Sequence, residues 1–130
     1  METNRMTADS RPSVLIADDH PEMLRAVRRL LALECDVAGI VSDRDELMEA
    51  ARQLQPDVIV IDVHLGDVDG MDVCREITHR DPVAKVIMVS ALDDATIRQR
   101  SFEAGASAFV HKMMPEDLLS AIQRVWAERG

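Results

Sequence analysis

The stretch "DVIVIDVHLGDVDGMDV", residues 57 to 73, begins as a run of β-branched apolar residues and continues into a segment where carboxylates recur every few positions. A continuous Val- and Ile-rich run is typical of a strand in a parallel sheet that helices cover on both faces. Asp62 stands near the end of that run, so the strand delivers its carboxylate to one edge of the sheet. This stretch therefore predicts a buried strand and a polar group at its end.

Strand-like and helix-like patterns alternate along the rest of the chain. Short apolar runs predict strands at 13–19, 36–43, 57–63, 84–91 and 107–112. Apolar residues at helical spacing predict helices at 20–34, 44–55, 71–80, 93–105 and 115–129. This alternation predicts an α/β, doubly wound fold with a five-stranded parallel sheet and helices on both faces. We expect the strand order 2-1-3-4-5.

Length, net charge and hydropathy limit what the chain can bind. Its 130 residues fit one domain, with a flexible lead-in expected at residues 1–12 and the folded unit at residues 13–130. The 24 acidic residues against 15 Lys and Arg give a net charge of -9, which disfavours direct binding to DNA or RNA. No segment approaches the roughly 20 apolar residues of a membrane span, and no signal peptide is evident. We therefore predict a cytoplasmic protein without membrane contact.

Charged and hydroxyl side chains follow the predicted strands at their carboxyl ends, where doubly wound folds bind ligands. They are Asp18 and Asp19 after the first strand, Asp62 at the third, Ser90 at the fourth and Lys112 at the fifth. In the expected order the first and third strands are neighbours, so three carboxylates would stand together. A hard divalent cation such as Mg2+, which prefers oxygen ligands, would relieve their mutual repulsion.

Phosphate is the usual further partner of Mg2+ that carboxylates hold. The chain has no GxxxxGK[ST] or GxGxxG loop for nucleotide phosphates. A carboxylate can itself be a nucleophile and form an acyl phosphate, and Asp62 is the best placed for that role. Lys112 would then neutralise one phosphoryl oxygen, and Ser90 would donate a hydrogen bond to another.

Four motifs carry a resemblance to a known family: "ADDHP" (17–21), "VIVIDVHLGDVDGMDV" (58–73), "VIMVSA" (86–91) and "FVHKMMPEDLLSAI" (109–122). In this order and at these spacings they resemble the receiver domain of two-component response regulators, over residues 13 to 128. The "DDHP" start and the "PEDLLSAI" helix are most similar to the NarL/FixJ type, whose receivers usually precede a DNA-binding helix-turn-helix domain. The resemblance implies a flavodoxin-like receiver fold.

The resemblance also implies a role for each residue of the site. Asp62 would accept a phosphoryl group from the phosphohistidine of a partner histidine kinase or of a phosphotransfer protein. Asp18, Asp19 and Asp62 would hold Mg2+ together with the main-chain carbonyl of His64, and Lys112 would contact the phosphoryl group. Such a domain is not a conventional enzyme, although it would catalyse its own Mg-dependent autophosphorylation and autodephosphorylation.

A conformational switch is implied as well. Ser90 sits where the family has its switch Ser or Thr, and Phe109 where it has its switch aromatic residue. Phosphorylation would pull Ser90 inward and let Phe109 follow, changing the face made by the segments 93–105, 107–112 and 115–129. That face would control a transcriptional output domain absent from this chain, so DNA would be contacted only through such a C-terminal domain. A homodimer could form through the first and last helices or through this face.

Four positions bear on how this chain differs within the family. Gly66 and Met113 stand where the family often has Pro, which favours more flexible loops. Phe109 lacks the phenol hydroxyl of the commoner Tyr. His64 borders the phosphoryl site, where it could change the rate of autodephosphorylation. Met114 is expected only to pack in its loop.

Simpler interpretations of the charged residues stay open at this point. Asp18 and Asp19 could merely cap the first helix. Asp62 and Lys112 could form a structural ion pair without function. The domain could also be a stand-alone receiver that relays phosphate or binds a partner, a degenerate receiver that binds its partner constitutively, or a hydrolase of small phosphate esters.

The remaining loop residues have their own alternatives. His20 and His64 could form a transition-metal site with the carboxylates. Asp67, Asp69 and Asp72 are expected to be loop and cap residues, with Asp72 opening the third helix.

Overall fold

The computed structural model describes residues 11–92, 94–112 and 114–128. Its main sheet has five parallel strands, β2 (Asp36–Val41), β1 (Ser13–Ala17), β3 (Val58–Asp62), β6 (Lys85–Ser90) and β7 (Ala108–His111), in that spatial order. The helices are α2 (Pro21–Leu31), α3 (Arg44–Leu54), α4 (Gly70–Arg80), α5 (Ala95–Glu103) and α6 (Pro115–Ala127). Counted along the chain, the sheet order is 2-1-3-4-5, which confirms the predicted doubly wound fold.

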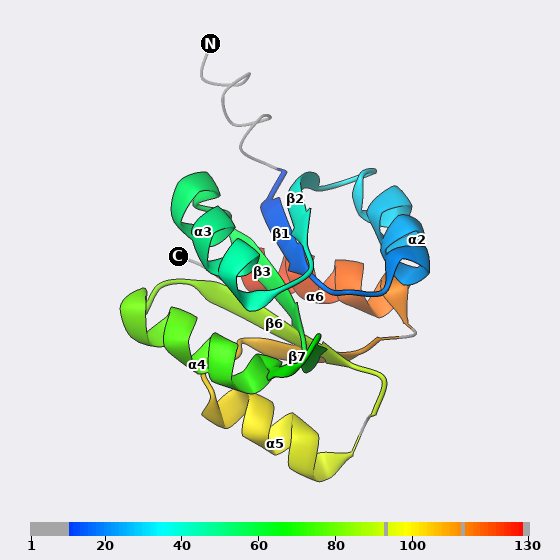
Figure 1. Ribbon diagram of the computed structural model, residues 1–130. Helices are drawn as coiled ribbons and strands as arrows, with labels where there is room; N and C mark the ends of the chain where they lie inside the picture. The colour runs from blue at the N-terminus through cyan, green and yellow to red at the C-terminus, as the bar shows by residue number, and fades with distance from the viewer. Residues whose placement is uncertain (1–10, 93, 113, 129–130) are drawn as a thin grey trace.

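Helices cover both faces of the sheet (Figure 1). Every residue of β3 is buried, and its side chains alternate between two cores. Val58 and Val60 pack on the side of α2 and α6, whereas Ile59 and Ile61 pack on the side of α3 and α4. Full burial of such a side chain contributes about 1.5–3 kcal/mol. The β-branched run of the central strand therefore stabilises both layers at once.

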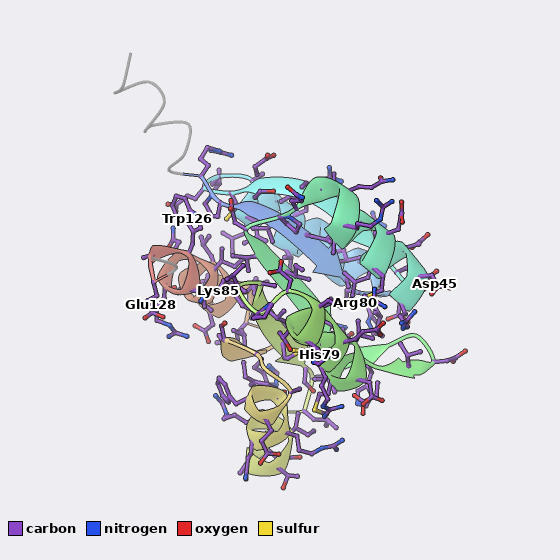
Figure 2. The ribbon with its side chains drawn as sticks, turned by 90° about the vertical axis from the view of Figure 1, so that its left-hand side faces the viewer. Asp45, His79, Arg80, Lys85, Trp126 and Glu128 are labelled. Carbon is purple, nitrogen blue, oxygen red and sulfur yellow. The ribbon has the colours of Figure 1, made fainter. Side chains whose placement is uncertain are left out.

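The helices turn their charged side chains outward. Asp45 of α3 and His79 and Arg80 of α4 are exposed and point away from the sheet (Figure 2). Helix α2 ends at Leu31, three residues before the predicted end, and Cys35 donates its N–H to the carbonyl of Leu31 at 2.7 Å. No helix in the described ranges is long and apolar enough to cross a membrane.

The loop after β3 contains a small hairpin that the sequence pattern did not predict. Its strands β4 (His64–Leu65) and β5 (Val68–Asp69) pair in antiparallel fashion, and Gly66 has φ 59 at the turn. A backbone with positive φ favours glycine, so this position suits the residue that replaces the family's common Pro. The hairpin lies in the connection between the end of the central strand and α4.

The cap of α4 corrects one prediction. Asp69, not Asp72, is the N-cap residue, and its side chain accepts a hydrogen bond from the N–H of Met71 at 2.9 Å. Asp72 lies inside the first turn and pairs with Arg75 at 2.8 Å. Both carboxylates are close enough in sequence to cap the helix, and the hairpin decides between them because its second strand ends at Asp69.

The chain returns from the hairpin directly against the end of β3. The N–H of Gly70 donates to the carbonyl of Val63 at 2.7 Å. A Cβ atom at Gly70 would lie only 2.1 Å from the carbonyl oxygen of Asp62. Glycine is therefore required here so that α4 can start beside Asp62.

The chain before β1 is expected to be a lead-in, and its residues 1–10 lie outside the described ranges, as does Met113. Arg11 donates to the carbonyls of Ala32 at 3.0 Å and Cys35 at 2.8 Å. The carbonyl of Pro12 accepts from Asp36 at 2.8 Å. These two residues are thus held against the domain.

Candidate functional site

Three strands deliver charged side chains to one point. In the ladder between β1 and β3, Ala17 pairs with Ile61, so Asp18 follows directly beside Asp62. Lys112 follows β7, and its Nζ lies 2.5 Å from Oδ2 of Asp62 and 3.0 Å from Oδ2 of Asp18. These three side chains are at most 7% exposed. The predicted convergence at the strand ends is therefore present.

Each carboxylate oxygen of Asp62 has its own partner. Oδ1 accepts from the N–H of His64 at 3.0 Å, and Oδ2 accepts from Lys112. Burial raises the pKa of the Asp62 carboxyl above its ordinary value, and the charge of Asp18 acts in the same direction. The hydrogen bonds from Lys112 and His64 oppose this rise without cancelling it. The ionised carboxylate is therefore held in a place where it needs a nearby cation.

Asp18 and Asp19 do not cap the helix that follows them. The N-cap of α2 is His20, which makes no side-chain cap hydrogen bond. Instead Oδ1 of Asp18 accepts from the N–H of His20 at 2.9 Å, which leaves Asp18 turned into the site. Asp19 is the more exposed of the pair, with 37% of its side chain accessible. The capping alternative is therefore wrong for these residues.

The acidic cluster has a composition that suits a divalent cation. Asp18, Asp19, Asp62 and His20 each offer one ligand atom, and these atoms all lie within 4.8 Å of one another. Asp18 and Asp62 contact the ammonium of Lys112 and Asp19 lies beside them, so negative charge is in excess of that one ammonium when all three carboxylates are ionised. Hard oxygen donors of this kind are the ligands that Mg2+ prefers. The residues present thus fit a magnesium site.

Ser90 lies one residue beyond the partner of Asp62 in the ladder between β3 and β6, where Asp62 pairs with Val89. It is completely buried. Its Oγ accepts from the N–H of Leu92 at 3.0 Å, and its carbonyl accepts from the N–H of Lys112 at 2.8 Å. The strand register therefore places Ser90 at the same end of the sheet as the acidic cluster.

Phe109 is buried in the next strand, β7, with 7% exposure. The guanidinium of Arg98 on α5 lies 4.8 Å from the centre of its ring. This distance is within the range of a cation–π contact. In this structure the ring is thus on the inside, covered by α5.

Several candidates from the sequence lie apart from the cluster. Asp69 and Asp72 serve α4, and Asp67 is exposed in the hairpin turn. The side chain of His64 is also exposed, and only its backbone N–H reaches Asp62. His20 is the residue whose place was least predictable, because the sequence shows only that it follows two aspartates.

Comparisons with known proteins agree with this geometry. The family model described as "Response regulator receiver domain" matches residues 14–123. The transcriptional regulatory protein DegU of Brevibacillus brevis is 30% identical over 129 residues, which cover 98% of this chain and 55% of DegU. The chemotaxis protein CheY of Thermotoga maritima is 30% identical over 114 residues, covering 86% of this chain and 95% of CheY.

A solved structure shows the same fold. The signal receiver domain of NarL from Mycobacterium tuberculosis superposes with a TM-score of 0.84 at 24% identity, covering 92% of this chain and 98% of that domain. This chain spans about half the length of DegU, 55% of it. The rest of that longer protein lies outside the matched region. Since the family model spans most of the chain, the protein belongs to the receiver-domain family of two-component response regulators.

Proposed function

We propose that this domain is a phospho-acceptor switch in which Asp62 accepts a phosphoryl group from a partner histidine kinase or phosphotransfer protein. Receiver domains are signalling modules that interact with such partners. The observation that carries the proposal is the buried Asp62 carboxylate, which Lys112 contacts at 2.5 Å. The same ammonium also contacts a second carboxylate, that of Asp18. A purely structural ion pair would not need Asp18 at the same ammonium.

The transfer step would balance as follows. One carboxylate oxygen of Asp62 attacks the phosphorus of the partner's phosphohistidine, and the phosphorus–nitrogen bond breaks. The electron pair of that bond stays on the imidazole nitrogen, which takes up a proton. The product is an acyl phosphate on Asp62, and attack of water on its phosphorus later returns the carboxylate and inorganic phosphate.

Asp18, Asp19, Asp62 and the main-chain carbonyl of His64 would hold Mg2+. When bound, the ion would neutralise charge on the phosphoryl oxygens. Lys112 would exchange its hydrogen bond to Oδ2 of Asp62 for one to a phosphoryl oxygen. The compact charge of its ammonium would then lie at a slightly different place.

The response would then pass along the sheet. Ser90 would donate its hydroxyl hydrogen to the phosphoryl group, which requires it to move toward Asp62. Phe109 would follow into the space that opens, and the cation–π contact with Arg98 of α5 would change. The face of α5, β7 and α6 is thus proposed to have two states, between which phosphorylation selects.

Two outputs fit this switch. The relative DegU is a transcriptional regulatory protein, which favours control of a DNA-binding domain joined to this one. A net charge of -9 makes direct contact between this domain and DNA unfavourable. CheY of Thermotoga maritima matches over 95% of its length, which favours a stand-alone receiver as the second candidate. A homodimer and a cytoplasmic location stay predictions.

Phosphorylation by a small donor tests the proposal without knowledge of the kinase. The chain is incubated with acetyl phosphate and Mg2+, and intact-mass spectrometry follows the phosphoryl adduct. We expect one acid-stable, base-labile adduct that Asp62→Asn abolishes. Asp67→Asn, which changes an exposed carboxylate of the hairpin turn, is the matched control and should keep it. An unmodified native chain, or an adduct that survives in Asp62→Asn, would refute the assignment.

A further inference from the structure

The backbone directs His20 toward the acidic cluster. As the N-cap of α2 it has φ -109 and ψ 94, and its N–H donates to Oδ1 of Asp18 at 2.9 Å. Its ring then folds over the same carboxylate, with Nδ1 2.9 Å from that oxygen. His20 thus contacts Asp18 at two points, through its backbone N–H and through its ring, although 60% of the side chain is exposed.

The same ring nitrogen borders the other carboxylates. Nδ1 of His20 lies 3.1 Å from Oδ1 of Asp19 and 3.6 Å from Oδ2 of Asp62. Within the described part of the chain, these residues and Asp18 form the group of His, Cys, Asp and Glu whose ligand atoms gather within 4.8 Å. The imidazole is therefore part of the cluster and not a neighbour of it.

A contact with Lys112 shows which way the nitrogen faces. Nζ of Lys112 lies 2.6 Å from Nδ1 of His20. An ammonium group has only donors, so toward Lys112 the ring nitrogen would accept, whereas toward the carboxylates of Asp18 and Asp19 the same nitrogen would donate, and its role depends on the tautomer of the ring. In either tautomer Nδ1 faces the place where the ammonium lies among the carboxylates. A divalent ion held by those carboxylates would meet this nitrogen and would bind it in its deprotonated form.

Metals differ in how they respond to an imidazole ligand. Mg2+ is a hard ion that prefers oxygen and keeps several waters. Co2+, Ni2+ and Zn2+ bind imidazole nitrogen well, and their affinities for a given nitrogen and oxygen site follow the general series of the first-row divalent metals. A nitrogen ligand in this cluster would therefore favour the transition metals and leave Mg2+ nearly unaffected.

His64 provides the contrast. It lies two residues from Asp62 and is exposed, yet it gives the site a backbone N–H and not its ring. Sequence alone makes the two histidines equal candidates for metal binding, whereas the structure selects one. Because the backbone of His64 belongs to the site, the exposed His79 of α4, which lies outside the cluster, is the matched control for any experiment on His20.

We propose that His20 supplies a nitrogen ligand to the divalent metal of this site and thereby sets its selectivity for first-row transition metals over Mg2+. The inference rests on the proposed metal site at Asp18, Asp19 and Asp62, and it adds a residue that binds metal but does not react. Phosphorylation could then proceed with either class of metal, at concentrations that His20 determines.

Metal affinity, not phosphorylation, is the test. The untagged, metal-free chain is titrated with Co2+ and separately with Mg2+ by calorimetry, and the visible absorption of Co2+ is recorded. We expect His20→Ala to weaken Co2+ binding at least about tenfold and Mg2+ binding by less than about threefold. The absorption spectrum of bound Co2+ should also change, because one nitrogen ligand is lost. His20→Gln, with an oxygen in place of the nitrogen, should behave like His20→Ala, and His79→Ala like the native chain.

Two results would overturn the inference. One is an equal change of Co2+ and Mg2+ affinity in His20→Ala, and the other is no change in either. Asp18→Asn separates this from the proposed function, because it should weaken both metals together. If Asp18→Asn leaves Mg2+ binding intact, the proposed metal site itself is wrong, whatever His20 does.

Discussion

Lys112 and Asp62 are 50 positions apart in the chain, yet Nζ of the lysine lies 2.5 Å from Oδ2 of the aspartate, and both side chains are buried. The same ammonium reaches Asp18 at 3.0 Å. One cation thus compensates two buried carboxylates, each of which would be costly to keep ionised alone. The same lysine therefore holds both buried carboxylates in place.

Lys112→Met should destabilise the domain by about 3 kcal/mol at neutral pH without divalent ions, because it leaves buried carboxylates without their cation. Saturating Mg2+ should remove part of this deficit. Urea unfolding with and without MgCl2 measures both effects. Lys85→Met is the control, since Lys85 is the other lysine of the chain and starts β6 at the far end of the sheet (Figure 2). A deficit that Mg2+ does not change would contradict the shared-cation account.

Asp62→Asn should stabilise the metal-free domain at neutral pH, and the gain should depend on pH. The folded pKa of Asp62 is raised above the model-compound value of 3.8, chiefly by burial. The folded state therefore holds the proton more tightly, and native stability falls as pH rises from 3.8 through the folded pKa. The variant lacks this loss of stability. Its gain in stability over the native chain should therefore be largest at pH values above the folded pKa and vanish at pH values below 3.8. Denaturation curves at several pH values would show this; a gain that is constant with pH would exclude it.

Gly70→Ala should cost about 3 kcal/mol, at the upper end for overpacking, because its Cβ would lie 2.1 Å from the backbone oxygen of Asp62. Gly66→Ala is the comparison. There the cost should be only about 1–2 kcal/mol, since the strain comes from φ 59 and the nearest atom to the new Cβ is 4.0 Å away. Chemical denaturation ranks the two variants, and the reverse order would show that the loop can move away from Asp62.

Ser90→Ala should uncouple the switch from the phosphoryl group. The chain has two phenylalanines, so fluorophenylalanine labelling yields a 19F signal for buried Phe109 and another for Phe102, which is 47% exposed. With beryllofluoride and Mg2+, the Phe109 signal should shift in the native chain while Phe102 changes little. In Ser90→Ala the adduct should still form, but the Phe109 shift should shrink. Ser90→Thr, which keeps the hydroxyl, should retain the shift, and an undiminished shift in Ser90→Ala would remove Ser90 from the switch.

Much of the fold could be predicted because its patterns are long. The apolar run before Asp62 is buried on both faces as expected, and the order of the five main strands agrees. The hairpin β4–β5 was missed because two-residue strands are too short to show a period. The cap of α4 was assigned to the wrong aspartate for a similar reason, since Asp69 and Asp72 have the same local chemistry and only the hairpin separates them.

The residues of the site also divide into those that the sequence predicts and those that it does not. Asp18, Asp62 and Lys112 stand at strand ends, so the topology alone brings them together. The ring of His20 depends on a backbone turn at Asp18 and on contacts with distant strands, which no spacing in the sequence encodes. Sequence thus predicts the placement of side chains at strand ends better than the placement of side chains whose direction depends on the conformation of a loop.

The pairing of Ala17 with Ile61 has a consequence for how this domain can change over generations. Side chains in a strand alternate with a period of two, so a single inserted residue in β3 would exchange the two cores and turn the carboxylate of Asp62 to the opposite layer. An insertion in β3 would therefore disturb the two cores and the placement of Asp62 together. Substitutions in the loops, at His20 or Gly66 for example, would leave this alternation of side chains unchanged.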